Sequence, residues 1–201
     1  MIKLIGAGPG NINLLTLQAL DEIKTADKVI AFERIAKDLH SLRPDIIVIK
    51  RVDQVLDQLE KIGGDETVAI MASGDSCFFG IIDLLKRKGV EIEEVLVGIS
   101  SVQYFFNRLQ KSYSSLETRS VHGRDFDFST IDKDKKYSFL IDQEKNANYI
   151  SKKLKDQGLS GKIYCGYNLS YDDEKILTIN IGDQIDEPSI LGVVVVEFNV
   201  D

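Results

Sequence analysis

Several kinds of residue are scarce in this sequence, and each scarcity excludes a class of protein. Its 201 residues include two cysteines, Cys77 and Cys165, which are far apart and form no CxxC pair. Neither a disulfide framework nor a zinc site is therefore predicted, and we expect no bound metal. No apolar run approaches the roughly 20 residues that cross a bilayer, and the apolar start at residues 1–6 is too short for a signal peptide. We expect a cytoplasmic protein that does not enter a membrane.

Positive charge is also in deficit. Lys and Arg number 25 against 32 Asp and Glu, which gives a net charge of −7. A broad basic face that holds nucleic acid is therefore not expected. The hydrophobic share of 43% and the charged share of 28% are ordinary for a globular protein with a substantial core.

The first half of the sequence alternates short apolar runs with amphipathic stretches. The apolar runs predict strands at residues 2–5, 29–32, 45–49, 67–72 and 95–97. The amphipathic spacing predicts helices at residues 16–24, 52–62 and 100–110. A further helix, which ends at residue 88, is predicted after the loop that follows the fourth strand. Nearly continuous apolar strands that alternate with helices favour a parallel sheet covered on both faces.

The second half has a different pattern. Strands are predicted at residues 118–122, 137–142, 162–166, 175–181 and 191–198, with one helix at 146–157. Short polar turns between the last strands favour antiparallel or mixed pairing. The polar stretch at residues 111–117 is the expected boundary. We predict two α/β domains, residues 1–112 with a largely parallel sheet and residues 113–201 with a mixed sheet.

Three loops of small residues follow predicted strands. They are GAGPGN at residues 6–11, SGDSCFFG at 73–80 and GISSVQ at 98–103. In an open α/β sheet the carboxyl ends of the strands meet at one crevice, where ligands bind. The three loops together predict a ligand site at this edge.

The first loop is close to a dinucleotide fingerprint but departs from it. The third glycine of GxGxxG would fall at Asn11, and Pro9 removes an N–H from the loop. Glu33, after the second strand, does resemble an acid that binds ribose. A dinucleotide-binding oxidoreductase, and a tight turn that binds nothing, both stay open at this point.

In combination, these loops resemble those of the tetrapyrrole methylases, the uroporphyrinogen and precorrin methyltransferases. Two later segments, SVHGR at residues 120–124 and NLSY at 168–171 followed by DEKI at 173–176, resemble the members that methylate carbon 5 of cobalt-precorrin-7 or precorrin-6Y. The resemblance covers essentially the whole chain. Ser76 and Val97 stand where the family usually has proline, which changes the stiffness of both loops.

The resemblance implies the tetrapyrrole methylase fold and S-adenosylmethionine as the cofactor, with S-adenosylhomocysteine as its product. It places the cofactor in a cleft between two domains. The implied cofactor-binding residues are Gly8, Pro9, Gly74, Asp75, Phe78, Ile99, Ser100 and Ser101 in the first domain, and Tyr167, Asn168, Leu169 and Gly192 in the second.

The implied substrate is a tetrapyrrole with a rim of carboxylates, which needs cationic partners. Arg108, Lys111, Arg119 and Arg124 gather around the domain junction, and we predict that Arg119 and Arg124 bind the substrate. His122 is the candidate catalytic residue, since an imidazole can orient the substrate or move a proton near neutral pH. A solvated arginine and a structural histidine are the alternatives.

The resemblance also implies a homodimer. Because some relatives carry a fused second enzyme, a separate carbon-15 methyltransferase and decarboxylase is the expected partner in the same pathway. The remaining alternatives are a family member that acts at another ring position and a nucleotide sensor without catalysis. A sensor would retain the loops without the HGR segment, which this sequence has.

Overall fold

The computed structural model describes residues 1–189 and 191–199, and the chain divides into two compact parts. The first part comprises Met1–Ser101, and the second begins at Val102. The dividing position lies at the start of a helix, about ten residues before the polar stretch in which the sequence places the domain boundary. The division after residue 112 stays a prediction.

The first part contains one sheet of five strands in the order β3-β2-β4-β1-β5, and every pairing in it is parallel. The strands are β1 (Ile2–Gly6), β2 (Lys28–Phe32), β3 (Ile47–Ile49), β4 (Val68–Ala72) and β5 (Glu94–Leu96). All five residues of β4 are buried. This central strand is apolar throughout because helices cover both faces of the sheet.

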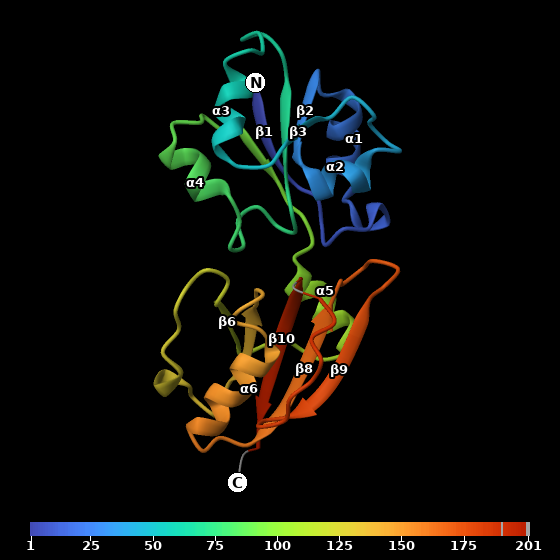
Figure 1. The fold of residues 1–201 in the computed structure, drawn as a ribbon. Coiled ribbons are helices and arrows are strands. Elements are labelled where there is room, and N and C mark those ends of the chain that lie inside the picture. The colour runs from blue at the N-terminus through green and yellow to red at the C-terminus, as the bar shows by residue number, and fades with distance from the viewer. Residues whose placement is uncertain (190, 200–201) are drawn as a thin grey trace. The chain divides into compact units, whose positions relative to one another are not determined.

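Four helices cover this sheet, two on each face (Figure 1). They are α1 (Leu17–Thr25) and α2 (Glu33–Leu39) on one face, and α3 (Asp53–Leu59) and α4 (Ile82–Arg87) on the other. Ile23 of α1 and Leu39 of α2 pack with Ile5 and Met71, whereas Leu85 of α4 packs on the opposite side. The parallel, doubly covered sheet predicted from the alternating pattern is confirmed.

The second part contains a mixed sheet in the order β6-β7-β10-β8-β9. The strands are β6 (Leu116–Ser120), β7 (Lys136–Leu140), β8 (Gly161–Tyr167), β9 (Lys175–Asn180) and β10 (Gly192–Phe198). The β6–β7 pairing is parallel and the other three are antiparallel. The predicted mixed sheet is confirmed, and β10, the last of these strands in the sequence, lies at its centre.

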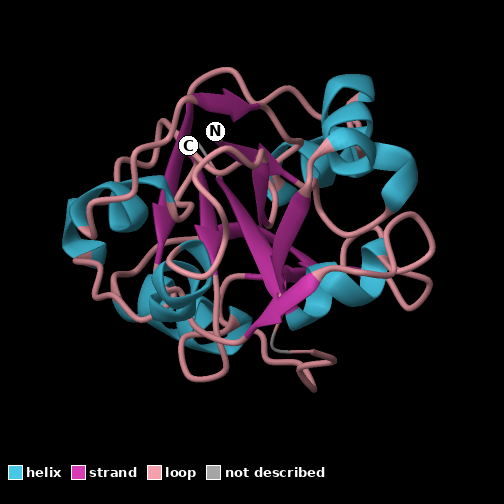
Figure 2. Ribbon diagram, turned by 90° about the horizontal axis from the view of Figure 1, so that it is seen from above, coloured by secondary structure: helices cyan, strands magenta, loops and turns pink. Residues whose placement is uncertain are grey.

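Helices flank the second sheet as well, as the labels in Figure 1 show, and Figure 2 draws helices in cyan and strands in magenta. Helix α6 (Ala147–Asp156) packs on the face to which Ile163 and Cys165 point. On the other face, α5 (Ser101–Leu109) brings Phe105 against Gly166, where an added Cβ would lie 2.8 Å from the ring. Side chains alternate between the two faces of a strand, so neighbouring positions of β8 serve two different helices.

Two local differences from the sequence-based elements have clear physical reasons. Helix α2 was not predicted, because it follows β2 directly and its N-cap is Phe32, which makes no side-chain capping bond. Strand β6 ends at Ser120, before His122, because Val121–Arg124 forms a tight turn. The amide of Arg124 donates to the carbonyl of Val121 over 3.2 Å.

The described residues contain neither a membrane-spanning helix nor a cluster suited to a metal ion. No described helix combines the length and the apolar character that crossing a membrane requires. Nor does any group of three or more His, Cys, Asp or Glu side chains, within residues 1–189 and 191–199, have an arrangement suited to a metal ion.

Candidate functional site

The three predicted loops meet at the carboxyl edge of the first sheet. The loops after β1 and β4 are joined by two backbone hydrogen bonds, since Gly8 N–H donates to the Gly74 carbonyl over 3.2 Å and Gly74 N–H donates to the Gly8 carbonyl over 2.8 Å. A Cβ added to Gly74 would lie 3.7 Å from Cα of Ser100, in the third loop. Seven of the eight predicted cofactor residues of the first part lie in these three loops, and the eighth, Ser101, is the first residue of α5 directly after the third loop.

Close backbone contact at Gly98 holds this arrangement together. A Cβ on Gly98 would overlap the carbonyl oxygen of Gly74 and would lie 2.7 Å from Cα of Gly6. These neighbouring atoms belong to the backbone, which cannot move away from an added Cβ as the end of a flexible side chain can. Only glycine allows three strand ends to approach this closely, and the approach leaves backbone N–H and C=O groups at the edge.

The second loop is shaped by its own side chains. Asp75 accepts a hydrogen bond from the amide of Cys77 over 2.8 Å, so it stabilises the turn and does not cap α4, whose N-cap is Ile81. Ser76 is fully buried, and its hydroxyl has no hydrogen-bond partner within the described residues. A buried hydroxyl without a hydrogen-bond partner is uncommon in folded proteins.

Phe78 and Phe79 follow in this loop and differ in backbone conformation. Their rings pack edge to face with centroids 5.1 Å apart. Phe79 has a φ of 52° and is 42% exposed. A left-handed conformation is strained for a bulky residue, and strain of this kind is concentrated at functional sites. The loop therefore presents an aromatic ring to solvent at an energetic cost.

We expect that strain to appear in a pair of substitutions. Phe79→Gly and Phe79→Ala both remove the ring, but glycine also removes the left-handed strain, so Phe79→Gly should be more stable by about 1 kcal/mol. At Phe78, whose φ is not positive, the same pair should show the opposite order, because glycine there only adds flexibility to the unfolded chain. Urea unfolding of the four variants measures both differences. The same order at both positions would show that Phe79 is not strained.

The predicted residues of the second part also gather at one end of their sheet. Tyr167 and Gly192 are register partners in the β8–β10 pair. The amide of Asn168 donates to the carbonyl of Leu191 over 3.1 Å. Asn168 has a φ of 47°, and its amide side chain bonds to Ser189 over 2.7 Å and to Asp173 over 2.6 Å. Leu169 is 5% exposed, so the segment offers its backbone more than its side chains.

The Tyr167 side chain is itself engaged. It is fully buried, and its hydroxyl donates a short hydrogen bond to the carboxylate of Glu187. Burial, together with this bond, raises the pKa of Tyr167 far above its usual value. Burial likewise raises the pKa of the neighbouring Cys165 thiol to about 12. Neither group ionises near neutral pH, so Tyr167 stays a hydrogen-bond donor.

Glu187 also bonds to the start of α6. Its other carboxylate oxygen accepts the backbone N–H of Asn148 over 2.9 Å. The side chain of Asn148 then binds the backbone of Ile185 twice, as donor over 2.7 Å and as acceptor over 2.8 Å. Glu187 was not among the predicted site residues, because an acid in a polar connection carries no recognisable pattern. The structure shows that it ties this connection to both Tyr167 and α6.

The HGR segment forms the tight turn after β6. Gly123 adopts a φ of 61°, and its amide donates to Asp142 over 2.8 Å. Backbone N–H groups of Lys145 and Gly123 hold the pKa of Asp142 below its usual value, so its negative charge fixes the turn. His122 and Arg124 are exposed on either side of Gly123. Neither side chain makes a hydrogen bond or ion pair to a residue that the structure describes.

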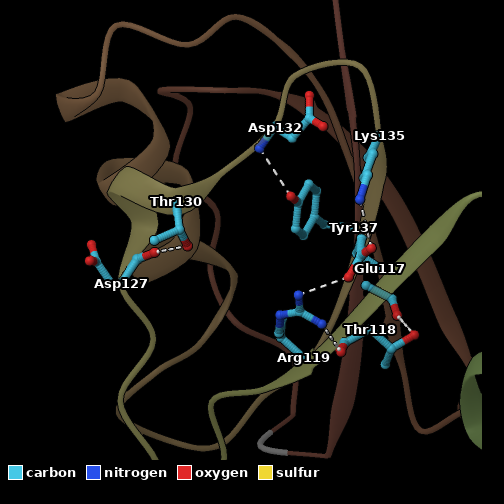
Figure 3. Close-up of polar contacts among 9 residues, drawn as sticks. Glu117, Thr118, Arg119, Asp127, Thr130, Asp132, Lys135 and Tyr137 are labelled. Atoms are coloured by element: carbon cyan, nitrogen blue, oxygen red, sulfur yellow. Dashed lines mark hydrogen bonds and ion pairs between the residues drawn. The ribbon is translucent and has the colours of Figure 1, made fainter.

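Arg119, by contrast, already has partners within its own strand. Its guanidinium donates to Glu117 over 2.8 Å and to the Thr118 carbonyl over 3.0 Å (Figure 3). Lys135 reaches the other oxygen of Glu117 over 2.9 Å. A substrate carboxylate would have to compete with Glu117 for Arg119.

The other two cations near the junction are also paired. Arg108 binds Glu174 over 2.7 Å and Lys111 binds Glu197 over 2.8 Å. Arg124 alone of the four predicted cations forms no ion pair with a described residue. Charge pairing within the chain therefore separates Arg124 from the rest as the strongest candidate for an external anion.

Arg34 is a charged residue at the carboxyl edge that sequence analysis passed over. It lies in the first turn of α2, and its Nη2 donates to the hydroxyl of Ser73 over 2.6 Å. Glu33, which resembled a ribose-binding acid, forms an ion pair with Lys50 over 3.2 Å. The signal that could have found Arg34 is its position two residues after the end of an apolar strand.

Comparison with known proteins adds to this geometry. The family model described as tetrapyrrole (corrin/porphyrin) methylases matches residues 1–184. A probable cobalt-precorrin-7 C(5)-methyltransferase of Methanocaldococcus jannaschii is 29% identical over 191 residues, covering 88% of this chain and 87% of that protein. A cobalt-precorrin-4 C(11)-methyltransferase of Priestia megaterium is 33% identical, but over 112 residues, 50% of this chain and 43% of that protein.

Solved structures share the fold. The precorrin-6Y methylase of Archaeoglobus fulgidus has a TM-score of 0.77 at 19% identity and covers 100% of this chain and 99% of its own. The uroporphyrin-III C-methyltransferase of Thermus thermophilus, complexed with S-adenosylhomocysteine, has a TM-score of 0.74 at 19% identity and covers 98% of this chain and 96% of its own.

Proposed function

The chain belongs to the tetrapyrrole methylase family, and from this premise we propose that it transfers a methyl group from S-adenosylmethionine to carbon 5 of cobalt-precorrin-7, or of the equivalent precorrin, in cobalamin biosynthesis. The observation that carries the proposal is the likeness to the C(5)-methyltransferase of M. jannaschii over 88% of this chain. Family membership sets aside the dinucleotide-binding oxidoreductase that the first glycine loop left open.

The extent of the likeness supports this ring position over others. The C(11)-methyltransferase of P. megaterium is the more identical protein where it aligns, yet it aligns with only 50% of this chain. A likeness that runs through both parts of the chain includes the HGR turn and the segment from Tyr167 to Leu169. A family member that acts at another ring position is the alternative, and product analysis by NMR separates the two.

The loops at the carboxyl edge fit the cofactor. S-adenosylmethionine, when bound, supplies a methyl group on a positively charged sulfur that a carbon nucleophile can attack directly. The loops around Gly8, Gly74 and Ser100 have backbone N–H and C=O groups and no bulky side chains at their closest approach. Such an edge holds an adenosine moiety through main-chain contacts, and a Cβ at Gly8 or Gly74 would be strained by the positive φ of those residues.

In this proposal the main contribution of the protein is to position the methyl donor and the substrate. Methyl transfer needs the donor and the attacking carbon to be held in line, which supplies much of the rate enhancement. Arg124 binds a substrate carboxylate at the HGR turn, and His122 orients the ring beside it. Asp142 fixes the backbone between them through Gly123. A His122→Ala variant that turns over like the wild type would remove His122 from this scheme.

The cofactor proposal makes a direct prediction. S-adenosylhomocysteine should bind at micromolar or lower concentration and NAD should give no heat, because the first loop lacks the glycine spacing that holds a pyrophosphate. Isothermal titration calorimetry measures both. Gly8→Val should lose S-adenosylhomocysteine binding, whereas valine in place of the exposed Ile12 should retain it. Heat from NAD alone would contradict the proposed class.

The proposal extends to assembly and place in the cell. We place the enzyme in the cytoplasm as a homodimer, with the carbon-15 methylation and decarboxylation carried out by a separate chain. Light scattering that returns the 22.5 kDa mass of one chain would contradict the dimer.

A further inference from the structure

The first part contains a cavity beside the loops that fit the cofactor. Its volume is about 240 Å³, and its walls come from the ends of β2 and β4 and from the residues that follow them. The lining includes the aromatic rings of Phe32 and Phe79, the aliphatic Ile35 and Ile81, and the polar Arg34 and Ser73. An apolar wall with a few convergent polar groups is the usual form of a small-molecule site.

Two features indicate that the cavity is adapted to a ligand. The hydroxyl of Ser73 accepts from Nη2 of Arg34 over 2.6 Å, which orients the guanidinium at the cavity wall. On the same wall, Phe79 holds a left-handed conformation with a φ of 52°, although relaxation would remove that strain. Arg34 thus places a positive charge at the wall of the cavity, and Phe79 places an aromatic ring there.

The size of the cavity limits what can enter it. Whole drug-sized ligands fill cavities of roughly 300–1,000 Å³, and a cavity of about 150 Å³ holds one benzene ring. The cavity volume of about 240 Å³ therefore suits a single five-membered ring with a side chain, not a complete macrocycle. The guanidinium selects a side chain that ends in a carboxylate.

We propose that this cavity binds one carboxylate-bearing ring of the tetrapyrrole, with Arg34 paired to the acetate or propionate group and Phe79 packed against the ring. The inference rests on the proposed function and adds a substrate site to it. Arg34 is then a specificity residue for the side chains of the substrate, and Ser73 is a positioning residue that acts through Arg34.

The test uses a stable tetrapyrrole in place of the substrate. Uroporphyrin III carries acetate and propionate groups, its octamethyl ester has the same ring without charge, and binding of either is followed by porphyrin fluorescence. Arg34→Gln should weaken uroporphyrin binding by about 10- to 100-fold, the usual value of a charge-assisted hydrogen bond. The uroporphyrin affinity of Arg34→Lys should lie between those of the wild type and Arg34→Gln, because lysine keeps the positive charge but cannot donate two parallel hydrogen bonds to a carboxylate. Phe79→Gly should weaken both porphyrins alike.

Controls separate this result from a general loss of structure. Arg87→Gln removes the same charge from an exposed position at the end of α4 and should bind as the wild type does. S-adenosylhomocysteine binding and the melting temperature of Arg34→Gln should stay near wild-type values. The ester should bind Arg34→Gln and the wild type equally.

The outcomes distinguish this inference from the proposed function. Unchanged uroporphyrin affinity in Arg34→Gln overturns the inference and leaves the proposed function intact. Equal loss of uroporphyrin and S-adenosylhomocysteine in Arg34→Gln also overturns it, because the residue would then act on the cofactor loops. A wild-type protein that binds S-adenosylhomocysteine but no uroporphyrin overturns the inference alone. A wild-type protein that binds neither overturns the proposed function.

Discussion

Gly98→Ala is expected to destabilise the protein by about 3 kcal/mol or more and to abolish S-adenosylhomocysteine binding. The added Cβ would overlap the Gly74 carbonyl and would lie 2.7 Å from Cα of Gly6, so the loops after β1, β4 and β5 would have to separate. Separation would break the Gly8–Gly74 hydrogen bonds and move the backbone groups that we propose hold the cofactor. Urea unfolding and calorimetry measure the two effects.

Gly64 provides a matched control for this substitution. A Cβ at Gly64 would meet nothing within 4 Å, and its backbone conformation suits any residue. Gly64→Ala should therefore change the free energy of unfolding by no more than about 0.5 kcal/mol and should leave binding unchanged. A Gly98→Ala protein as stable as Gly64→Ala would show that the three loops do not depend on backbone contact.

Glu187→Ala should cost about 2 to 3 kcal/mol of stability, the second large effect that we expect. The substitution leaves the buried Tyr167 hydroxyl and the backbone N–H of Asn148 without their acceptor. Because the Tyr167 pKa is raised far above neutrality, the hydroxyl cannot ionise, so it stays an unsatisfied donor. The adjoining segment from Asn168 to Leu169 should loosen, and S-adenosylhomocysteine affinity should fall with it.

A double-variant cycle isolates the Tyr167–Glu187 bond. Tyr167→Phe removes the donor, so the double variant Tyr167→Phe/Glu187→Ala should recover part of the stability lost in Glu187→Ala. The remaining deficit reports the lost bond to Asn148. Additive losses in the double variant would show that the two side chains do not interact. Chemical denaturation at pH 7 suffices, because Tyr167 does not titrate there.

The sequence was most informative where small residues repeat in a fixed relation to strands. The loops at residues 6–11, 73–80 and 98–103 each follow an apolar run, and the parallel sheet brings them to one edge. Their function as cofactor-binding residues stays a prediction. What no pattern revealed is that the loops touch backbone to backbone at Gly98, because the distance between strand ends depends on the twist and order of the sheet.

The site residues that sequence analysis missed are those whose role depends on a distant partner. Arg34 belongs to a helix without a capping side chain, and its partner Ser73 lies 39 positions away. Glu187 meets Asn148 from a separation of 39 positions and Tyr167 from 20. Glu117 and Arg119 are only two positions apart, but the residue pattern did not show that Glu117 binds the Arg119 guanidinium. Composition and spacing do not determine such pairs.

The position of β10 has a consequence for the order in which the chain folds during synthesis. All strands of the first sheet are present once Leu96 has been added, so that sheet can form while the ribosome is still extending the polypeptide. The second sheet is complete only once Gly192–Phe198 has been added, because this central strand lies between the β6–β7 pair and the β8–β9 pair. Until then the edges of β7 and β8 that pair with β10 stay open, and an open strand edge promotes aggregation.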